Sequence, residues 1–383
     1  MGHRKGSAGE GQAHGHVPRT VAKLIVVRAG RSMHVEPGTG AQGEGSAVAP
    51  GEVPWLLIDR GLPVSDNEGT WGAGEGTSGR AIMGIVSMAE ILGRAARGGY
   101  AVGYFESWDQ YSFEATLEAA EETRSPLILG FGGAVSSQPW LERWGVEAMG
   151  ALAHCLAERA TVPAAILFNE ARTYAQVLRG LRAGCNAVML DTSHLPLQEN
   201  IALTRKVVEA AHALGASVEA ELGSLPDASG EPMQGPVASA PQRTDPAEAA
   251  LFVSRTGVDA LAVSIGNTHV LAEGEAAVDL DLLARIHEAV PLPLVIHGGT
   301  GFPAWAVEPA IQRGVAKINV GTRLKGACLA GIRAALAQLP PRPNVHRVIG
   351  SREEGDILIR GKIGSKAEIV ALLRLYGCAG QAE

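Results

Sequence analysis

The chain has 383 residues, of which 46% are hydrophobic, and a net charge of −7, which is enough length for one large α/β domain or two ordinary ones. It has no run of about twenty apolar residues that would span a membrane, and no basic block that would favour nucleic acid as the main partner. The four cysteines form no close pair, and the N-terminus lacks the apolar core of a signal peptide. We therefore expect a soluble cytoplasmic protein without a disulfide framework.

The first part of the chain, residues 1–81, differs in composition from the rest. It is rich in Gly, Ser and Ala, which is typical of loops or disordered segments. Two short strand-like runs lie within it, at residues 23–27 and 54–59, and they fit a small appendage that packs on the main domain or on a neighbouring subunit. We predict an N-terminal Gly-rich extension over residues 1–81, and a main domain with a C-terminal helical tail over residues 82–383.

In the main domain, short apolar runs alternate with helical patterns. Eight such runs predict strands, at residues 101–105, 126–131, 163–168, 187–191, 217–222, 259–264, 293–297 and 316–320. Strands that alternate with helices predict parallel β/α units, and eight is the number that closes a (β/α)8 TIM barrel. A doubly wound open sheet is the alternative, but no strand is followed by a GxGxxG phosphate-binding fingerprint. The fold class that we predict is α/β, a (β/α)8 barrel.

Several predicted helices have sequence signals at their ends. Asp245 precedes Pro246, which predicts an N-cap followed by proline at the first helical position. Glycines stand where four helical patterns are expected to stop, at residues 184, 215, 257 and 314, because glycine readily ends a helix.

Polar side chains gather where the predicted strands end, which is the edge of such a barrel that carries function. They are Asn169 and Glu170 after the third strand, Asp191 after the fourth, Glu219 and Glu221 on the fifth, His269 after the sixth, His297 at the end of the seventh, and Asn319 to Thr322 at the eighth. Any one of them alone is more often structural. However, Glu219 and Glu221 share one face of a strand, where two like charges are costly unless a cation or donors compensate. Two histidines and a carboxylate at one barrel mouth form a ligand set that catalytic zinc accepts.

Four stretches of the sequence are informative as a set: GCNAVMLDTSHLPLQENIALTRKVVEAAHALGASVEAELG, TGVDALAVSIGNTH, PLVIHGGTG and AKINVGT. Together they resemble the class II, metal-dependent ketose-bisphosphate aldolases, over about residues 86–335. The resemblance implies a (β/α)8 barrel enzyme that cleaves a ketose phosphate or forms it, with dihydroxyacetone phosphate as one of the two halves. It implies zinc or another divalent metal that stabilises the enediolate, and it allows a monovalent cation as a second cofactor. A small sugar phosphate as substrate and a homodimer or homotetramer are implied as well.

The resemblance also gives roles to the residues at the strand ends. His269 and His297 match two zinc ligands of the family, and Asp191 and Glu221 match carboxylates that hold the metal in an alternative position. Contacts with phosphate and dihydroxyacetone are implied for the substrate-binding residues Gly298, Gly299, Thr300, Asn319, Gly321 and Thr322. A glycine-rich backbone offers N–H groups to an anion, so the physical chemistry agrees with this assignment.

The sequence departs from the family at the proton-transfer position. Where the family has an aspartate and a zinc-binding histidine, this chain has Asn169 and Glu170. An asparagine side chain cannot take or deliver a proton at ordinary pH, whereas a glutamate can replace a histidine as a zinc ligand. We predict Glu170 as the third metal ligand. The candidate catalytic residues are Asn169, Glu170 and two acids of the flexible loop after Glu221, Asp227 and Glu231.

Further departures affect substrate binding. The segment after His269 begins with Val270 and contains no basic residue as far as Asp281, although a lysine that holds phosphate is common there in the family. The second strand ends in two glycines, and the first leads into FESWDQ rather than an asparagine-rich segment. Three functions are compatible with these changes: an aldolase for a ketose phosphate with proton transfer through water or another acid, a metal-dependent barrel enzyme with a less phosphorylated substrate, and a non-catalytic relative that binds a metabolite or a partner.

Overall fold

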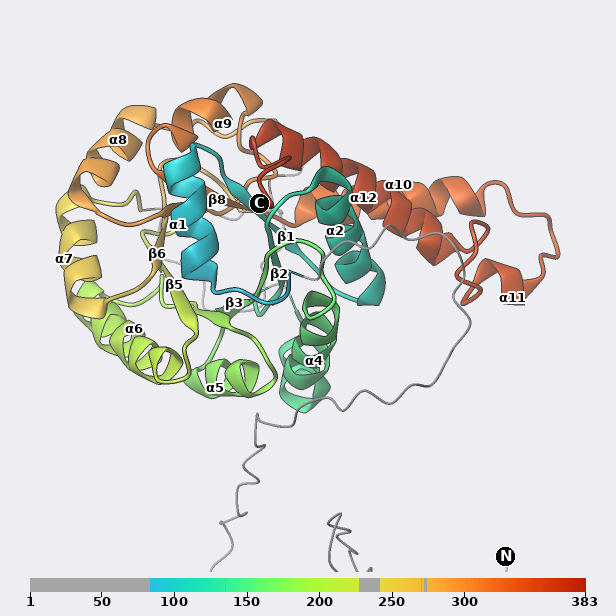
Figure 1. Ribbon diagram of the computed structural model, residues 1–383, viewed down its shortest axis with the longest axis horizontal. Coiled ribbons are helices and arrows are strands. Elements are labelled where there is room, and N and C mark those ends of the chain that lie inside the picture. Colours follow the sequence, from blue (N-terminus) through green and yellow to red (C-terminus); the bar gives the residue numbers. More distant parts are fainter. Residues whose placement is uncertain (1–82, 135, 227–241, 270, 272–273) are drawn as a thin grey trace, which may run out of the picture. The chain divides into compact units, whose positions relative to one another are not determined.

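The computed structural model describes residues 83–134, 136–226, 242–269, 271 and 274–383. Parallel strands close into one barrel in chain order, with the first strand also paired to the last (Figure 1). They are β1 (Val102–Glu106), β2 (Leu127–Gly132), β3 (Ala164–Ala171), β4 (Ala187–Leu190), β5 (Ser217–Leu222), β6 (Ala260–Val263), β7 (Leu294–Ile296) and β8 (Val315–Val320). The predicted (β/α)8 barrel is confirmed. The predicted strand ends agree to within one residue, except that β3 continues to Ala171.

Helices cover the barrel, with α1 across one of its ends and the others around its sides (Figure 1). They are α1 (Met88–Gly98), α2 (Gln110–Thr123), α3 (Gln138–Trp140), η1 (Leu141–Gly145), α4 (Val146–Ala157), α5 (Tyr174–Arg182), α6 (Leu197–His212), α7 (Pro246–Thr256), α8 (Leu280–Ala289) and α9 (Ala304–Ile311). The predicted cap is present, since the Asp245 side chain accepts N–H groups from Ala247 and Glu248. The four predicted helix-ending glycines all have positive φ, for example 72° at Gly257.

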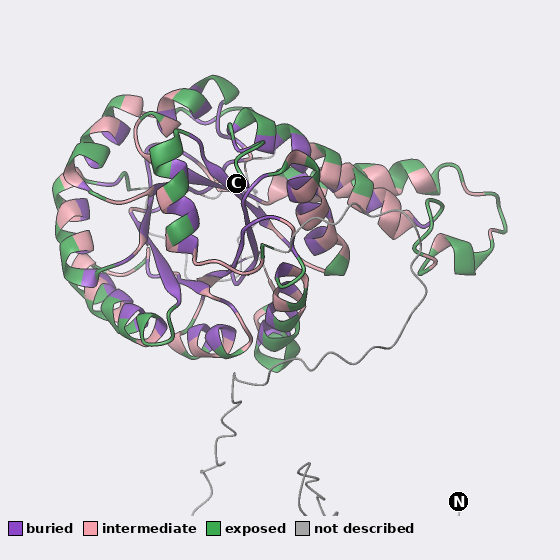
Figure 2. Cartoon of the chain, viewed as in Figure 1, coloured by how far each residue is buried: buried purple, intermediate pink, exposed green. Residues whose placement is uncertain are grey.

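The core lies between the strands and the inner faces of the helices (Figure 2). In α1 the buried residues are Met88, Ile91, Leu92 and Ala95, the i, i+3, i+4, i+7 spacing of an amphipathic helix. The strands are buried over nearly their whole length, which is why they read as continuous apolar runs in the sequence. Within the barrel this apolar pattern is broken by polar side chains, and these form the site described below.

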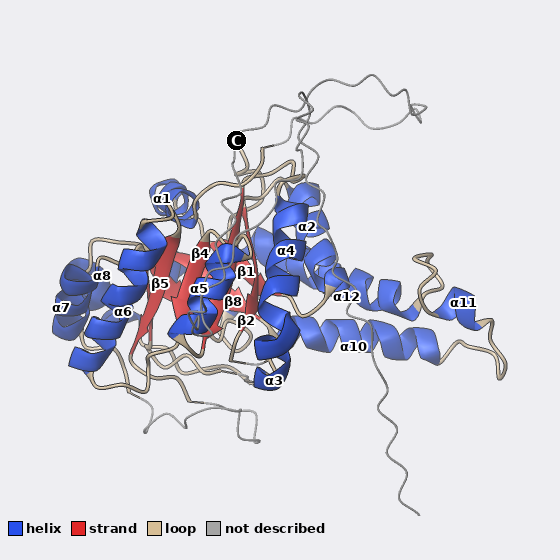
Figure 3. Ribbon diagram, turned by 90° about the horizontal axis from the view of Figure 1, so that it is seen from below, coloured by secondary structure: helices blue, strands red, loops and turns tan. Residues whose placement is uncertain are grey.

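After the barrel the chain forms α10 (Thr322–Leu336), α11 (Val345–Val348) and α12 (Ile357–Leu375). Helices α10 and α12 lie side by side, and α12 also packs against α2 (Figure 3). This helical arm exposes several large apolar side chains, at Leu329, Leu336, Val345, Ile349 and Ile363. Among the described residues no helix is long and apolar enough to cross a membrane.

Several predictions concern residues outside the described ranges. They are the two strand-like runs at residues 23–27 and 54–59, and the loop acids Asp227 and Glu231. The division into an extension over residues 1–81 and a main domain over residues 82–383 stays a prediction.

Candidate metal centre

Three side chains of the type that bind metals converge at the C-terminal mouth of the barrel. Glu170 comes from β3, His269 follows β6, and His297 follows β7. Their ligand atoms all lie within 4.8 Å of one another. The two imidazole rings meet edge to face, with centroids 5.9 Å apart. A carboxylate and two imidazoles form a ligand set that suits a catalytic divalent cation such as zinc.

The two nitrogens of His297 have different surroundings. Nε2 lies 2.9 Å from Glu219 Oε1, whereas Nδ1 lies 2.9 Å from Glu221 Oε2 and 3.2 Å from Glu170 Oε1. Nδ1 is buried and makes no well-directed hydrogen bond to any residue within the described ranges. Donation of the Nε2 proton to Glu219 leaves the lone pair on Nδ1, pointing toward two carboxylates. The lone pair of His297 Nδ1 and the neighbouring carboxylate oxygens are therefore suitable ligands for a cation bound between them.

The electrostatics of this group agree with that interpretation. Burial opposes the charged form of His297, but contacts with Glu170, Glu219 and Glu221 raise the pKa of His297 well above its usual value. Burial also opposes the charge of Glu170, yet His297, His269 and Arg172 lower the pKa of Glu170 to about 2. Glu170 is therefore ionised at neutral pH and available as a ligand. The excess of negative side chains attracts a cation, and a proton on His297 takes that role when no metal competes.

The backbone of β3 directs Glu170 into this group. Glu170 has φ of 50°, in the left-handed region, and the pairing of β3 with β4 shifts register between Phe168 and Ala171. Such a bulge changes the direction of a side chain and is common next to active sites. A Cβ atom at Gly133 would lie 2.4 Å from the carbonyl oxygen of Glu170, so the glycine at the end of β2 leaves room for the bulge. Asn169, just before it, is 4% exposed, and no other residue that the structure describes hydrogen-bonds to its Oδ1.

A buried lysine, which the sequence pattern did not indicate, contacts the carboxylate that is hydrogen-bonded to His297. Lys317 Nζ lies 2.8 Å from Glu219 Oε2 and 2.6 Å from Asn319 Oδ1. Lys317 and Glu219 are both fully buried, and the ammonium group lies 4.9 Å from the Tyr104 ring centroid. Glu219 thus contacts both the Lys317 ammonium group and His297, and it orients the imidazole ring. A charged residue inside the otherwise apolar run of β8 was the available signal for Lys317.

Replacing Lys317 by methionine is expected to lower the free energy of unfolding by about 3–5 kcal/mol, because it removes the ammonium group from the buried Glu219 carboxylate and leaves His297 as its remaining partner. Urea denaturation measures this change. The matched control is Lys206→Met, since the exposed Lys206 lies 4.2 Å from the Tyr174 ring centroid and its loss should cost at most about 1 kcal/mol. Equal effects of the two substitutions would contradict the assigned role of Lys317.

Of the other two predicted metal carboxylates, Glu221 lies against His297, but Asp191 is engaged elsewhere. Asp191 Oδ2 lies 2.6 Å from Arg172 Nη1, and Asp191 Oδ1 accepts the Ser193 hydroxyl at 2.8 Å. The structure therefore does not bring Asp191 into the group of three ligand-type side chains. Arg172 is a further charged residue at this mouth that the sequence pattern did not indicate.

The predicted substrate-binding segments lie together at the same mouth. Gly298 has φ of 67°, and a Cβ atom there would lie 2.2 Å from the carbonyl oxygen of Thr268, so only glycine fits. Gly299 donates its N–H to the carbonyl of Asn319 at 2.8 Å, which ties the glycine loop to β8. That N–H group is consequently engaged within the protein rather than free for an anion. Thr322 begins α10, and the N-terminal end of a helix attracts anions.

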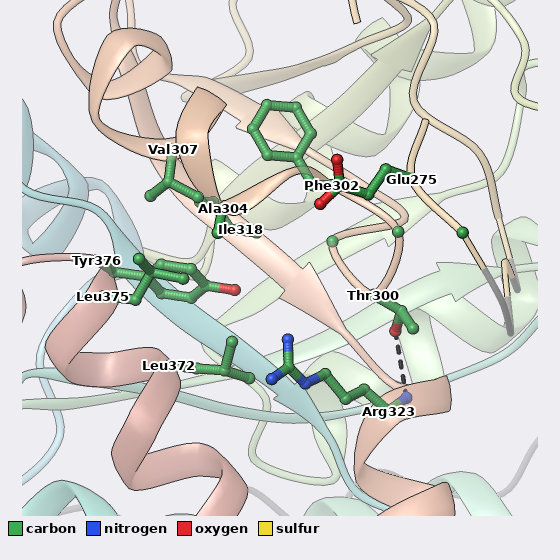
Figure 4. A pocket seen from close by; sticks show the side chains of 13 residues that line it. Glu275, Thr300, Phe302, Ala304, Val307, Ile318, Arg323, Leu372, Leu375 and Tyr376 are labelled. Carbon is green, nitrogen blue, oxygen red and sulfur yellow. Dashed lines mark hydrogen bonds between the residues drawn. The ribbon is translucent and has the colours of Figure 1, made fainter. Parts of the chain in front are cut away.

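A cavity of about 220 Å³ lies on the outer side of the glycine loop, between α9, α10 and α12 (Figure 4). Its polar lining includes Glu275, Thr300 and Arg323. The Thr300 hydroxyl accepts the backbone N–H of Arg323 at 3.2 Å, and the Arg323 side chain is paired with Glu368. None of the three ligand-type residues lines this cavity, so it is separate from the candidate metal centre.

The fold and the three ligand-type side chains define a (β/α)8 barrel protein with a candidate metal centre at its C-terminal mouth. Residues 86–381 match the model of the class II fructose-bisphosphate aldolase family. The chain is 35% identical to the probable fructose-bisphosphate aldolase of Bacillus subtilis, over 78% of this chain and 100% of the relative. It is 36% identical to the fructose-bisphosphate aldolase of Geobacillus stearothermophilus, over 78% of this chain and 99% of the relative.

Solved structures show the same relationship. The YdjI aldolase from Escherichia coli K12 matches with a TM-score of 0.65 and 29% identity, over 78% of this chain and 100% of that one. A putative fructose-1,6-bisphosphate aldolase from Coccidioides immitis matches with a TM-score of 0.67 and 26% identity, over 77% and 97% of the two chains. The chain belongs to the class II fructose-bisphosphate aldolase family, a family of metal-dependent aldolases.

Proposed function

We propose that this protein is an aldolase that cleaves or forms a carbon–carbon bond of a phosphorylated ketose, with zinc held by Glu170, His269 and His297. The observation that carries the proposal is the convergence of these three side chains within 4.8 Å at the barrel mouth. A metal bound there supplies Lewis-acid stabilisation of the enediolate that remains when the bond breaks. Asp191 and Glu221 stay candidates for an alternative metal position, and a monovalent cation stays a candidate second cofactor.

The protein's own groups bind and orient the substrate in this proposal. Gly298 to Thr300 and Asn319 to Thr322 surround the place of the dihydroxyacetone phosphate half. Asn319 Nδ2 is buried and has no hydrogen-bond partner in the described part of the chain, so it is available to a substrate oxygen. Asn169 can donate or accept a hydrogen bond on the aldehyde half but cannot exchange its proton. The loop acids Asp227 and Glu231 stay candidate proton-transfer groups.

A second candidate is an aldolase for a less phosphorylated ketose. It is favoured by the charge of the mouth, where Glu106, Glu170 and Glu221 contribute carboxylates, while the segment after His269 brings no lysine. Like charges disfavour a second phosphate on the substrate.

The test is a retro-aldol assay with zinc-loaded protein on matched phosphorylated and unphosphorylated ketoses. Formation of dihydroxyacetone phosphate from a ketose phosphate supports the first candidate, and cleavage of only unphosphorylated ketoses supports the second. A protein that binds no metal and cleaves neither class would be a non-catalytic relative, which would refute both candidates.

We also propose that the protein is a homodimer or homotetramer in which the helical arm contacts a second copy of the chain. Light scattering is then expected to give two or four times the chain mass of 39.7 kDa. Val345→Asp and Ile349→Asp, at positions 64% and 59% exposed, should shift the mass toward the monomer, because a buried unpaired charge opposes association. The control Leu214→Asp, at a position 66% exposed on the barrel, should not; a monomeric wild-type protein would contradict the proposal.

A further inference from the structure

A carboxylate at the end of β1 lies in the barrel mouth outside the group of ligand-type side chains. Glu106 is the last residue of β1, two positions after Tyr104, so both side chains point to the same face of the strand. That face is the barrel interior, because the Tyr104 ring contacts the buried Lys317. The Glu106 side chain is 14% exposed. It is thus mostly enclosed, with a small part of its surface accessible.

The two carboxylate oxygens of Glu106 have different surroundings. Oε1 lies 3.2 Å from Lys325 Nζ. Oε2 has no hydrogen-bond partner among the described residues, and a Cβ atom at Gly321 would lie 2.5 Å from it. Gly321 belongs to the segment that the proposed function places around the substrate, and its missing side chain gives Oε2 access to that segment. One oxygen is therefore held and the other is free to contact a substrate.

The charges around Glu106 suit proton exchange. Burial raises the pKa of Glu106 above its ordinary value, Lys325 and His269 oppose this rise, and Glu170 adds to it. A carboxyl group whose pKa is raised toward the working pH exchanges protons more effectively than an ordinary surface carboxylate. Lys325 itself is 40% exposed and lies 5.7 Å from the Trp108 ring centroid, so its charge is only partly screened from Glu106.

The neighbouring strands β2 and β3 provide no other side chain at the mouth that is free to exchange a proton with the substrate. Across β2, which pairs with both β1 and β3, the side chain facing the mouth is Asn169, and an amide has no exchangeable acid–base proton at ordinary pH. Glu170 is the proposed metal ligand, and coordination occupies its lone pairs. Between β1 and β3, the end of β2 contributes glycines at residues 132 and 133, which carry no titratable group.

We propose that Glu106 is a catalytic acid–base residue of the aldol reaction, acting on the oxygen of the aldehyde half. This inference rests on the proposed aldolase function. In cleavage, the hydroxyl proton of the aldehyde half passes to Glu106 Oε2 as its oxygen forms the carbonyl and the carbon–carbon bond breaks. The bond electrons stay with the ketone half as the enediolate, which takes a proton from solvent, and Glu106 returns its proton to solvent. In condensation, Glu106 donates the proton that makes the new hydroxyl.

The test separates the two halves of the reaction with zinc-loaded full-length protein. The first probe is deuterium exchange into dihydroxyacetone phosphate, which needs only the ketone half of the reaction. The second is condensation of dihydroxyacetone phosphate with glycolaldehyde, which needs the ketone half and the aldehyde half. Glu106→Gln is expected to keep stoichiometric zinc and exchange within about threefold of wild type, while condensation falls about 10²–10⁴-fold. The control Glu118→Gln removes a carboxylate that pairs with Lys362 outside the mouth and should leave both rates unchanged.

Two further readouts distinguish proton transfer from a structural role. Formate should partly restore condensation to Glu106→Ala, because it supplies a carboxyl group in the vacated space. The wild-type condensation rate should fall as pH rises through the pKa of Glu106, since only the protonated form donates, and this fall should be absent in Glu106→Gln. Condensation by Glu106→Gln at the wild-type rate, or equal loss of exchange and condensation, would overturn the inference. If the wild-type protein catalyses neither exchange nor condensation, the proposed function itself fails.

Discussion

Replacing His297 by alanine is expected to abolish stoichiometric binding of a divalent cation and to reduce aldol turnover to background. His297 is 1% exposed, and its Nδ1 lies among Glu170, Glu221 and His269. Without the imidazole only two ligand-type side chains of the group are left, and a catalytic zinc site generally needs three protein ligands. Removing the metal also removes the stabilisation of the enediolate, which accounts for several kcal/mol of the barrier.

Metal analysis after purification without chelator measures the first effect, and the retro-aldol assay measures the second. His212→Ala is the matched control, because His212 is 42% exposed and pairs with Asp259 on the outer surface. That control should keep both metal and turnover. Metal that survives in His297→Ala, or negligible metal in the wild-type protein, would show that the centre has been assigned wrongly.

Most of the fold could be predicted from the sequence because its signals are local. A parallel strand covered on both faces appears as a short apolar run, and the run at residues 217–222 coincides with β5. The β3 run was predicted to end before Asn169, yet β3 continues to Ala171. The reason is the bulge at Glu170, whose left-handed backbone is set by neighbouring strands rather than by its own sequence.

The candidate site could be predicted only in part. The residues that end strands could be recognised as a group, since parallel strands in a barrel end at one mouth. Their pairing could not be recognised, because it depends on contacts between distant parts of the chain. Lys317 and Glu219 are 98 residues apart, and Lys325 and Glu106 are 219 residues apart. The same limit explains Asp191, whose carboxylate is bound by Arg172 rather than pointing to the three ligand-type side chains.

Cleavage of fructose 1,6-bisphosphate by the unmodified protein is expected to be absent or far slower than is usual for the family. The resemblance places Asn169 at the family's proton-transfer position, and loss of a positioned acid–base group there costs about 10²–10⁴-fold in rate, or roughly 3–5 kcal/mol in the barrier, unless another group such as the proposed Glu106 takes the same proton from the bisphosphate. The lysine-free segment after His269 weakens the hold on phosphate further. A coupled assay for triose phosphates measures the rate.

Asn169→Asp alone is not expected to restore that cleavage fully. Asn169 is buried beside Glu170, so a new carboxylate there would meet a like charge and little solvent, and both effects favour its protonated form over the base that cleavage needs. It would also leave phosphate binding unchanged, so any gain should appear in kcat rather than in KM. Zinc content is measured alongside to ensure that the substitution has not displaced the metal. Turnover of several per second by the wild-type protein on this substrate would contradict the expectation, and would mean that Glu106 or a loop acid, Asp227 or Glu231, transfers the proton efficiently even with a bisphosphate bound.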